Sequence, residues 1–264
     1  MKIALMDSGI GLLPAAAAVR RMRPDADLVL SSDPDGMPWG PRTVEDLTER
    51  ALAVARAAAA HGPDALIVGC NTASVHTLPA LRAELEPRIP VIGTVPAIKP
   101  AAVGGGKVAI WATPATTGSP YQRGLIRDFA DGAEVTEVPC PGLADAVEHD
   151  DAEAVRRAVA AAAALTPPDV RALVLGCTHY ELVAEQIRAA LPRTEGLPPV
   201  VLHGSAGAVA AQALRRIGVE ANPAAAPTGG LTVLLSGRTG DLGPAALSYA
   251  EGRVLRAATV ALPG

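Results

Sequence analysis

The sequence contains ALIVGCNT at residues 65–72 and ALVLGCTH at residues 172–179. Each segment is an apolar run followed by a glycine, a cysteine and polar residues that can open a helix. A second pair of similar segments lies at nearly the same separation: residues 2–8 resemble residues 107–113 at a shift of 105, and the two cysteines are 107 residues apart. Matched segments at matched separations predict two copies of one α/β unit, each with a thiol at a strand end.

Apolar runs alternate with alanine-rich helical stretches along the whole chain. This alternation is typical of βαβ units and a mainly parallel sheet. Strands are expected in the runs before Cys70 and Cys177 and at residues 2–6, 28–30, 90–95, 108–111, 134–138, 200–202 and 231–235. Helices are expected at residues 13–22, 43–61, 121–129 and 151–165, in the alanine-rich segment that ends at residue 217, and last near residues 245–249.

The predicted fold class is α/β, with two similar α/β units of mainly parallel sheets, pseudo-twofold related, and an active site between them. Pro96, Pro100 and the glycine run 104–106 mark a boundary. The chain after about Leu202 holds too little structure for a core of its own, so we expect it to rejoin the first domain. The predicted domains are residues 1–96 with 208–264, carrying Asp7 and Cys70, and residues 97–207, carrying Cys177 and His179.

The composition narrows the class of protein. Of the 264 residues 49% are hydrophobic and 2% aromatic, so Ala, Val, Leu and Ile must build the cores. The sequence contains no run of about twenty apolar residues, so it predicts no membrane span. The first expected strand starts at Lys2, which argues against a signal peptide. Three cysteines without a CxxC pair favour a reducing compartment, hence a cytoplasmic location. A net charge of −4 offers nucleic acid no basic surface.

The two cysteines are the strongest candidates for chemistry. Parallel α/β units present their chemistry at the carboxyl ends of strands, where Cys70 and Cys177 lie, and the N-terminus of a following helix stabilises a thiolate. A single cysteine usually only fills space, but two at equivalent places favour function. Two facing thiols could remove a proton from one side of a carbon and return one to the other. Cys140, between two prolines, is expected to be structural.

Other polar residues have two interpretations each. Asp7 and Ser8 open DSGIG at residues 7–11, which is either a ligand-binding turn or an ordinary helix cap. His179 either sets the protonation of the thiol two residues before it or is a capping or surface residue. Glu148 is most simply a surface acid. The remaining histidines have no comparable partner and are expected to be solvated or packed: His61, His76, His149 and His203.

The sequence predicts no cofactor and no metal. The glycine run 104–106 precedes a strand, so it is not a dinucleotide loop. Lys99 is the one lysine that could form a Schiff base with pyridoxal, and its neighbours do not support that role. Zinc ligation by Cys70, Cys177 and His179 would match no usual spacing.

The sequence resembles the glutamate racemases of the aspartate/glutamate racemase superfamily from Ile3 to about Gly237. The motifs that carry the resemblance are DSGIG (7–11), PWG (38–40), CNTAS (70–74), VPAIKP (95–100), ATPAT (112–116) and GCTHY (176–180). The resemblance implies a cofactor-independent enzyme that interconverts L- and D-glutamate with two cysteines and supplies D-glutamate for peptidoglycan. It also implies a small-molecule substrate, no membrane or nucleic-acid partner, and a homodimer as one expected assembly.

The resemblance also implies roles for particular residues. Cys70 would take the α-proton from D-glutamate and Cys177 from L-glutamate. Asp7 would assist Cys70, and His179 with Glu148 would assist Cys177. The implied substrate-binding residues are Asp7, Ser8, Trp39, Gly40, Asn71, Thr72, Thr116, Thr178 and His179.

The chain departs from the family pattern in three places. Pro38-Trp39-Gly40 stands for Pro-Tyr-Gly, Pro34-Asp35-Gly36 for a Thr-Ala-Arg run, and His203-Gly204-Ser205 for Asp-Ser-Gly. These changes leave alternatives open: a racemase or isomerase of another acid such as aspartate, or a non-catalytic binding protein on the same fold. A decarboxylase would need only one protonating thiol, and a binding protein would not need to keep both.

Overall fold

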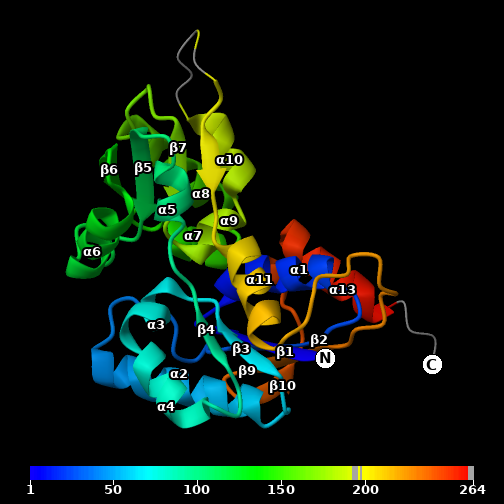
Figure 1. The fold of residues 1–264 in the computed structure, drawn as a ribbon. Helices are drawn as coiled ribbons and strands as arrows, with labels where there is room; N and C mark the ends of the chain where they lie inside the picture. The colour runs from blue at the N-terminus through cyan, green and yellow to red at the C-terminus, as the bar shows by residue number, and fades with distance from the viewer. Residues whose placement is uncertain (192–195, 197, 261–264) are drawn as a thin grey trace. The chain divides into compact units, whose positions relative to one another are not determined.

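The structure, a computed structural model, describes residues 1–191, 196 and 198–260. The chain divides into two compact units, Met1–Val95 with Ala206–Gly264 (the first unit) and Pro96–Ser205 (the second unit). Each unit is a mainly parallel sheet with helices packed on it, which confirms the predicted α/β class (Figure 1).

The first unit is built on a sheet of order β10-β9-β2-β1-β3-β4, parallel except for β10. Its strands are β1 (Lys2–Asp7), β2 (Asp27–Ser32), β3 (Ala65–Val68), β4 (Val91–Gly93), β9 (Leu231–Leu235) and β10 (Arg238–Gly240). Its helices are η1 (Ile10–Leu12), α1 (Leu13–Met22), α2 (Val44–Ala59), α3 (Asn71–His76), α4 (Leu78–Leu85), α11 (Ala206–Arg216), α12 (Pro244–Ser248) and α13 (Ala250–Val260).

The second unit is built on a parallel sheet of order β6-β5-β7-β8. Its strands are β5 (Gly106–Ala112), β6 (Ala133–Pro139), β7 (Ala172–Leu175) and β8 (Val201–His203). Its helices are α5 (Ile98–Ala102), α6 (Pro120–Phe129), α7 (Leu143–Glu148), α8 (Ala152–Ala164), α9 (Thr178–Glu181) and α10 (Ala184–Ala190).

The repeat seen in the sequence extends to the topology. The order β2-β1-β3-β4 in the first unit and β6-β5-β7-β8 in the second both place the second strand beside the first, then the third and the fourth. The strand before Cys70 and the strand before Cys177 are therefore the third strand of each unit and pair with its first strand. Both thiols lie where a parallel sheet presents its carboxyl ends.

Small apolar side chains pack the helices onto the sheets. In the first unit, Ala4 and Met6 of β1 join a cluster with residues of α2 and α4. In the second unit, Val108 and Ile110 of β5 pack with residues of α5. The alternation along each strand places every second residue on the same face. The intervening residues are also buried, Ile3 and Leu5 in β1 and Ala109 and Trp111 in β5, so the first strand of each unit is covered on both faces.

Three long helices begin with side-chain caps of the kind that predicts a helix start. Thr43 accepts a hydrogen bond from the Asp46 N–H in α2, Ser119 accepts one from Gln122 in α6, and Asp151 accepts from two N–H groups in α8. Among the described residues, no helix combines the length and apolar character needed to cross a membrane.

Two elements near the end of the chain were not expected. The last predicted helix stopped at Tyr249, yet a further helix, α13, follows it. Gly252 made this segment a poor helix candidate, but a Cβ there would lie 1.9 Å from the Ala246 carbonyl oxygen, so the glycine allows close packing on α12. Strand β10 was missed because it is only three residues long and carries two polar side chains.

Candidate active site

Cys70 and Cys177 occupy the same backbone position in the two units. Each is the N-cap residue of a short helix, with φ −125° and ψ 123° at Cys70 and φ −136° and ψ 136° at Cys177. Their exposures are nearly equal, 8% and 9%. The two thiols are therefore held in matching, largely water-shielded places at strand ends.

A glycine before each cysteine makes this placement possible. The Gly69 N–H donates to the Met6 carbonyl, and the Gly176 N–H donates to the Trp111 carbonyl, both at 2.7 Å. A Cβ on Gly176 would lie 2.7 Å from the Trp111 oxygen, and one on Gly69 would lie 3.0 Å from the Cα of Leu12. Without a side chain, each glycine lets the strand end lie close to its neighbour, which brings the cysteine to the end of the central strand.

Asp7 and Ser8 follow directly from the central strand of the first unit. Asp7 ends β1, which pairs with the strand before Cys70, and its side chain is fully buried. One carboxylate oxygen accepts from the Ser8 N–H at 2.6 Å and from the Ser8 hydroxyl at 3.3 Å. The helix η1 that follows begins at Ile10, and its N-cap residue is Gly9 rather than Asp7 or Ser8.

The other residues expected at this strand end differ in exposure. Asn71 is buried at the first position of α3, and Thr72 beside it is half-buried. Gly40 is exposed, whereas Trp39 is buried in the same apolar cluster as Cys70. The indole N–H of Trp39 donates to the Asp33 carboxylate at 3.0 Å. The aromatic ring lies near the thiol's helix, but its only donor already has a partner within the protein.

In the second unit, the thiol faces a histidine that a carboxylate holds. The Cys177 sulfur lies 3.8 Å from His179 Nδ1, and His179 Nε2 lies 2.8 Å from Glu148 Oε2. The histidine and glutamate side chains are only 10% and 12% exposed, so the interpretation of Glu148 as a surface acid is wrong. A carboxylate on one ring nitrogen fixes the orientation of the imidazole and stabilises its protonated form. The other ring nitrogen is then placed to exchange a proton with the thiol.

Cys140 lies in a different environment from the other two thiols. It is buried, and its thiol donates to the Val138 carbonyl. The backbone carbonyl of Cys140 accepts a hydrogen bond from the Tyr180 hydroxyl at 3.4 Å. Burial first, and then the charge of Cys177, raise the pKa of Cys140 to about 12. Burial also raises the pKa of the Tyr180 phenol well above its usual range. Both groups stay neutral near pH 7, as expected of a structural cysteine and its neighbour.

Thr116 and Thr178 are held differently. Thr116 lies in the loop after β5, its hydroxyl 3.2 Å from that of Thr113. Glu137 holds the end of this loop through the Gly118 N–H at 2.8 Å. Thr178 is buried at the first position of α9, directly after the thiol.

The remaining histidines and Lys99 were expected to have no part in the chemistry, and their surroundings fit that expectation. His61, His76, His149 and Lys99 are exposed. His203 is half-buried, and burial lowers its pKa.

Sequence reasoning missed Asp33. It is the first residue after β2, its N–H donates to the Ser8 carbonyl at 3.1 Å, and its side chain is the acceptor for Trp39. The available signal was an acidic residue directly after a strand end, next to the strand that ends in Asp7.

Comparison with known proteins places these features in a family. A family model described as Asp/Glu/hydantoin racemase matches residues 13–219. The glutamate racemase of Granulibacter bethesdensis is 36% identical over 255 residues, covering 90% of this chain and 89% of that protein. The glutamate racemase of Roseiflexus sp. is 37% identical over 192 residues, covering 71% and 70%.

Solved structures give the same result at the level of the fold. The structure of Escherichia coli glutamate racemase matches with a TM-score of 0.76 and 27% identity, covering 98% of this chain and 95% of that one. Glutamate racemase from Thermus thermophilus matches with a TM-score of 0.68 and 29% identity, covering 96% and 92%. On the family match and the identity to its relatives, this chain belongs to the Asp/Glu/hydantoin racemase family.

Proposed function

We propose that this protein interconverts L-glutamate and D-glutamate without a cofactor, using Cys70 and Cys177 as its two acid/base groups. The observation that carries the proposal is the matched pair of thiols, each at a strand end, each after a close-packed glycine and each at a helix N-cap. The choice of glutamate is supported by relatives of 36% and 37% identity that are named glutamate racemase.

The proposed reaction moves one proton off the α-carbon and one proton onto it. With D-glutamate, the Cys70 thiolate takes the α-proton, and the Cys177 thiol gives its proton to the opposite side of the carbanion. The product is L-glutamate, and Cys177 is left as the thiolate. L-Glutamate reacts in the reverse sense, from that state. General acid–base groups positioned in this way contribute about 10²–10⁴-fold each to the rate.

Each thiol is proposed to have its own assisting group. His179 exchanges a proton with Cys177 through Nδ1, and Glu148 stabilises the imidazolium that forms when His179 takes the proton. In the first unit, the buried carboxylate of Asp7 serves Cys70 from the end of the neighbouring strand. With these assisting groups, each cysteine alternates between two protonation states, the thiol and the thiolate.

The substrate's charged groups are proposed to bind to the hydroxyl, amide and backbone groups at the two strand ends. In the first unit these are Ser8, Gly40, Asn71 and Thr72, and in the second they are Thr116 and Thr178. Buried hydroxyl and amide groups can bind a carboxylate or an ammonium group without adding another charge to the site.

The decisive experiment incubates the purified protein with L- or D-glutamate in deuterated water, with no cofactor added. We expect the opposite enantiomer to form with deuterium at the α-carbon, by chiral chromatography and proton NMR. The double variant Cys70→Ala, Cys177→Ala is the matched control. Absence of turnover with glutamate would overturn the proposal, and turnover of aspartate alone in a parallel reaction would move the function to that substrate.

We also propose that the D-glutamate formed supplies peptidoglycan. The solved E. coli relative is described with L-glutamate and the activator UDP-MurNAc-ala, which supports this context. Expression in a bacterial strain that requires D-glutamate should restore growth without the supplement. The double-cysteine variant should not restore it, and equal rescue by both proteins would contradict the proposal.

A homodimer and a cytoplasmic location stay predictions. Light scattering of the purified protein and fractionation of expressing cells would test them.

A further inference from the structure

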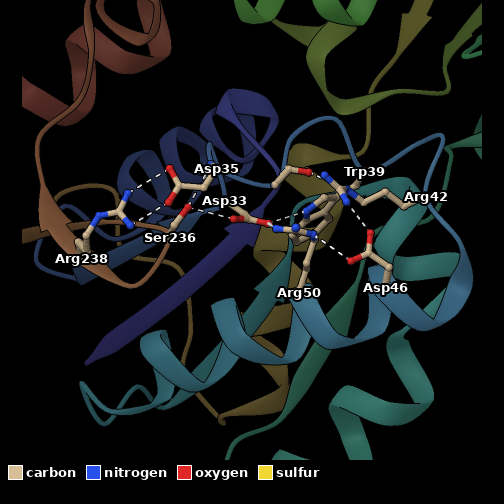
Figure 2. Close-up of polar contacts among 9 residues, drawn as sticks. Asp33, Asp35, Trp39, Arg42, Asp46, Arg50, Ser236 and Arg238 are labelled. Carbon is tan, nitrogen blue, oxygen red and sulfur yellow. Dashed lines mark hydrogen bonds and ion pairs between the residues drawn. The ribbon is translucent and has the colours of Figure 1, made fainter.

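Asp33 joins three separate segments of the first unit from a buried position. Its side-chain oxygens accept hydrogen bonds from Trp39 Nε1 at 3.0 Å, Arg50 at 3.3 Å and the Ser236 hydroxyl at 2.9 Å (Figure 2). Trp39 lies in the loop before α2, Arg50 in α2, and Ser236 in the turn between β9 and β10. A buried carboxylate needs partners of this kind, because an uncompensated one is costly to desolvate.

The backbone of Asp33 reaches the loop that carries Asp7 and Ser8. Its N–H donates to the Ser8 carbonyl at 3.1 Å, and Ser8 in turn donates to the Asp7 carboxylate. Asp33 therefore contacts two of the first-unit segments that the family motifs place at the substrate, DSGIG through its backbone and PWG through its side chain.

The surrounding loop is closed tightly on this carboxylate. A Cβ on Gly36 would lie 2.0 Å from Asp33 Oδ2 and 2.1 Å from a guanidinium nitrogen of Arg50, so a larger residue there would have to displace these charged groups. The Gly36 carbonyl accepts from Arg42 Nε at 2.7 Å, which holds the loop from its other side. Such closure leaves the carboxylate no room to turn toward another partner.

Ser236 adds a second sign that this contact matters. Its φ is 47°, in the left-handed region that residues other than glycine seldom adopt. The Asp33 bond to its hydroxyl and the bond from its N–H to the Ser32 carbonyl at 2.7 Å stabilise that conformation. Strained backbone of this kind persists where its surroundings determine it, often next to functional sites.

We propose that Asp33 is a positioning residue for the substrate-binding edge of the first unit, acting through Trp39 and Ser8. This inference rests on the proposed function. Three protein donors already fill the Asp33 carboxylate, so it orders the two loops before substrate arrives and does not hold the substrate itself. Because its indole N–H is bonded to Asp33, Trp39 contributes an aromatic wall of fixed position. The fixed ring also fixes the backbone of Gly40 next to it.

The contact itself can be tested without measuring turnover. The chain has two tryptophans, so Trp111→Phe leaves Trp39 as the only one. In that background, Asp33→Asn should raise acrylamide quenching of Trp39 by at least about twofold, because the indole loses its charged acceptor. Asp35→Asn is the matched control, since this exposed carboxylate two residues away pairs with exposed Arg238. Equal quenching in both variants would overturn the contact.

The functional part is tested by steady-state kinetics in both directions. Asp33→Asn should raise KM for both enantiomers about fivefold to tenfold with kcat changed less than about twofold, since misplaced binding loops weaken binding in the ground and transition states alike. Trp39→Phe should raise KM about twofold to threefold, because it removes the N–H and keeps a ring. Asp35→Asn should leave both parameters unchanged.

Thermal unfolding separates positioning from a merely structural role. A lower Tm for Asp33→Asn with unchanged KM would overturn the proposal. If Asp33→Asn does not fold, Trp39→Phe and Ser236→Ala decide, and unchanged KM in both would overturn it. A wild-type protein without racemase activity would instead overturn the proposed function, while the quenching experiment would still decide the Asp33–Trp39 contact.

Discussion

The strand ends at Cys70 and Cys177 share a backbone and differ in the groups around it. Both cysteines follow a close-packed glycine and cap a short helix. The shift of 105 residues that aligns the first strands places Ala112 where the first unit has Asp7, and the shift of 107 places Thr72 where the second unit has His179. Each unit thus carries one proposed assisting group at a position where the other unit has a residue of a different kind.

This difference teaches that the repeat determines where each thiol lies but not which neighbouring group exchanges a proton with it. In the proposed mechanism, a carboxylate at a strand end assists Cys70, whereas Cys177 is assisted by an imidazole from the helix that follows it and by a glutamate from an earlier helix. A two-base reaction needs different surroundings for its two thiols, because one sulfur must be the thiolate while the other is the thiol. The matched features and the unmatched ones therefore predict different experimental results.

The matched thiols should give the largest and most nearly equal effects. Cys70→Ser and Cys177→Ser should each lower kcat/KM for glutamate by about 10³-fold or more, because a serine hydroxyl is a far poorer base than a thiolate near pH 7. Circular dichroism of each enantiomer's conversion measures the rates. Near-wild-type turnover in either variant would contradict the two-base proposal.

The unmatched assistants should give smaller losses of rate than the thiols, with isotope effects that move in opposite directions. His179→Asn and Asp7→Asn should each lower kcat/KM by about 10²-fold. Enantiomers have equal free energies in water, so this loss must be the same in both directions for every variant. The asymmetry should appear in isotope effects with α-deuterated substrate.

Each assistant affects one proton transfer. His179→Asn makes transfer to and from Cys177 slower, so the isotope effect should rise with L-glutamate and fall with D-glutamate. Asp7→Asn should do the reverse. Isotope effects that move together in the two variants would mean that Asp7 and His179 do not serve separate thiols.

Much of this comparison could be predicted from the sequence, because it depends on local pattern. The apolar run, glycine and cysteine place each thiol at a strand end, and that placement is found in both units. The partner of His179 is different in kind. Glu148 lies 31 residues earlier on another helix, so only the resemblance to a family pointed to it, and its own sequence context indicated a surface acid.

Glu148→Gln is expected to have a moderate effect that separates charge from geometry. The amide can still bond to His179 Nε2, but it does not stabilise an imidazolium as a carboxylate does. We expect kcat to fall about tenfold with KM within about twofold, measured with both enantiomers. A loss as large as that of His179→Asn would mean that Glu148 does more than support the histidine.

Packing around the strand ends could not be predicted from the sequence, since it depends on atoms from distant segments. The role of Gly36 depends on Asp33 and on Arg50, which lies in the helix after this loop. The role of Gly252 depends on a carbonyl of the preceding helix. In both places a glycine that suggests only a flexible link allows close contact. The same argument distinguishes the two glycines before the cysteines.

Gly176→Ala should therefore destabilise the protein more than Gly69→Ala. The new methyl group would meet the Trp111 carbonyl oxygen at 2.7 Å in the first case and the Cα of Leu12 at 3.0 Å in the second. Overpacking of this kind typically costs about 1–3 kcal/mol, and we expect Gly176→Ala near the upper end. Denaturant unfolding followed by circular dichroism would measure the difference. The reverse order would show that the neighbours of Gly176 can relax more easily.

The last expected effect is confined to alkaline pH and concerns the thiol that has no counterpart in the first unit. Burial keeps Cys140 protonated in the folded protein, with a pKa of about 12 against an ordinary value of 9.0. The unfolded chain loses this proton first as pH rises, so the contribution of Cys140 to stability is complete below about pH 9 and is lost between about pH 9 and 12. A single group of this kind lowers the free energy of unfolding by about 1.4 kcal/mol per pH unit within that window at most.

Cys140→Ala should remove this contribution while keeping the site intact. We expect wild-type and variant stabilities, from urea unfolding, to converge between pH 9 and 11, with the wild type losing more because the variant has no buried thiol to deprotonate on unfolding. Native protein at pH 8 should react with iodoacetamide at Cys70 and Cys177 and leave Cys140 unmodified, because the thiolate is the reactive form. Equal alkaline slopes for the two proteins, or rapid labelling of Cys140 in the folded state, would mean that this third thiol is no more shielded than the two at the strand ends.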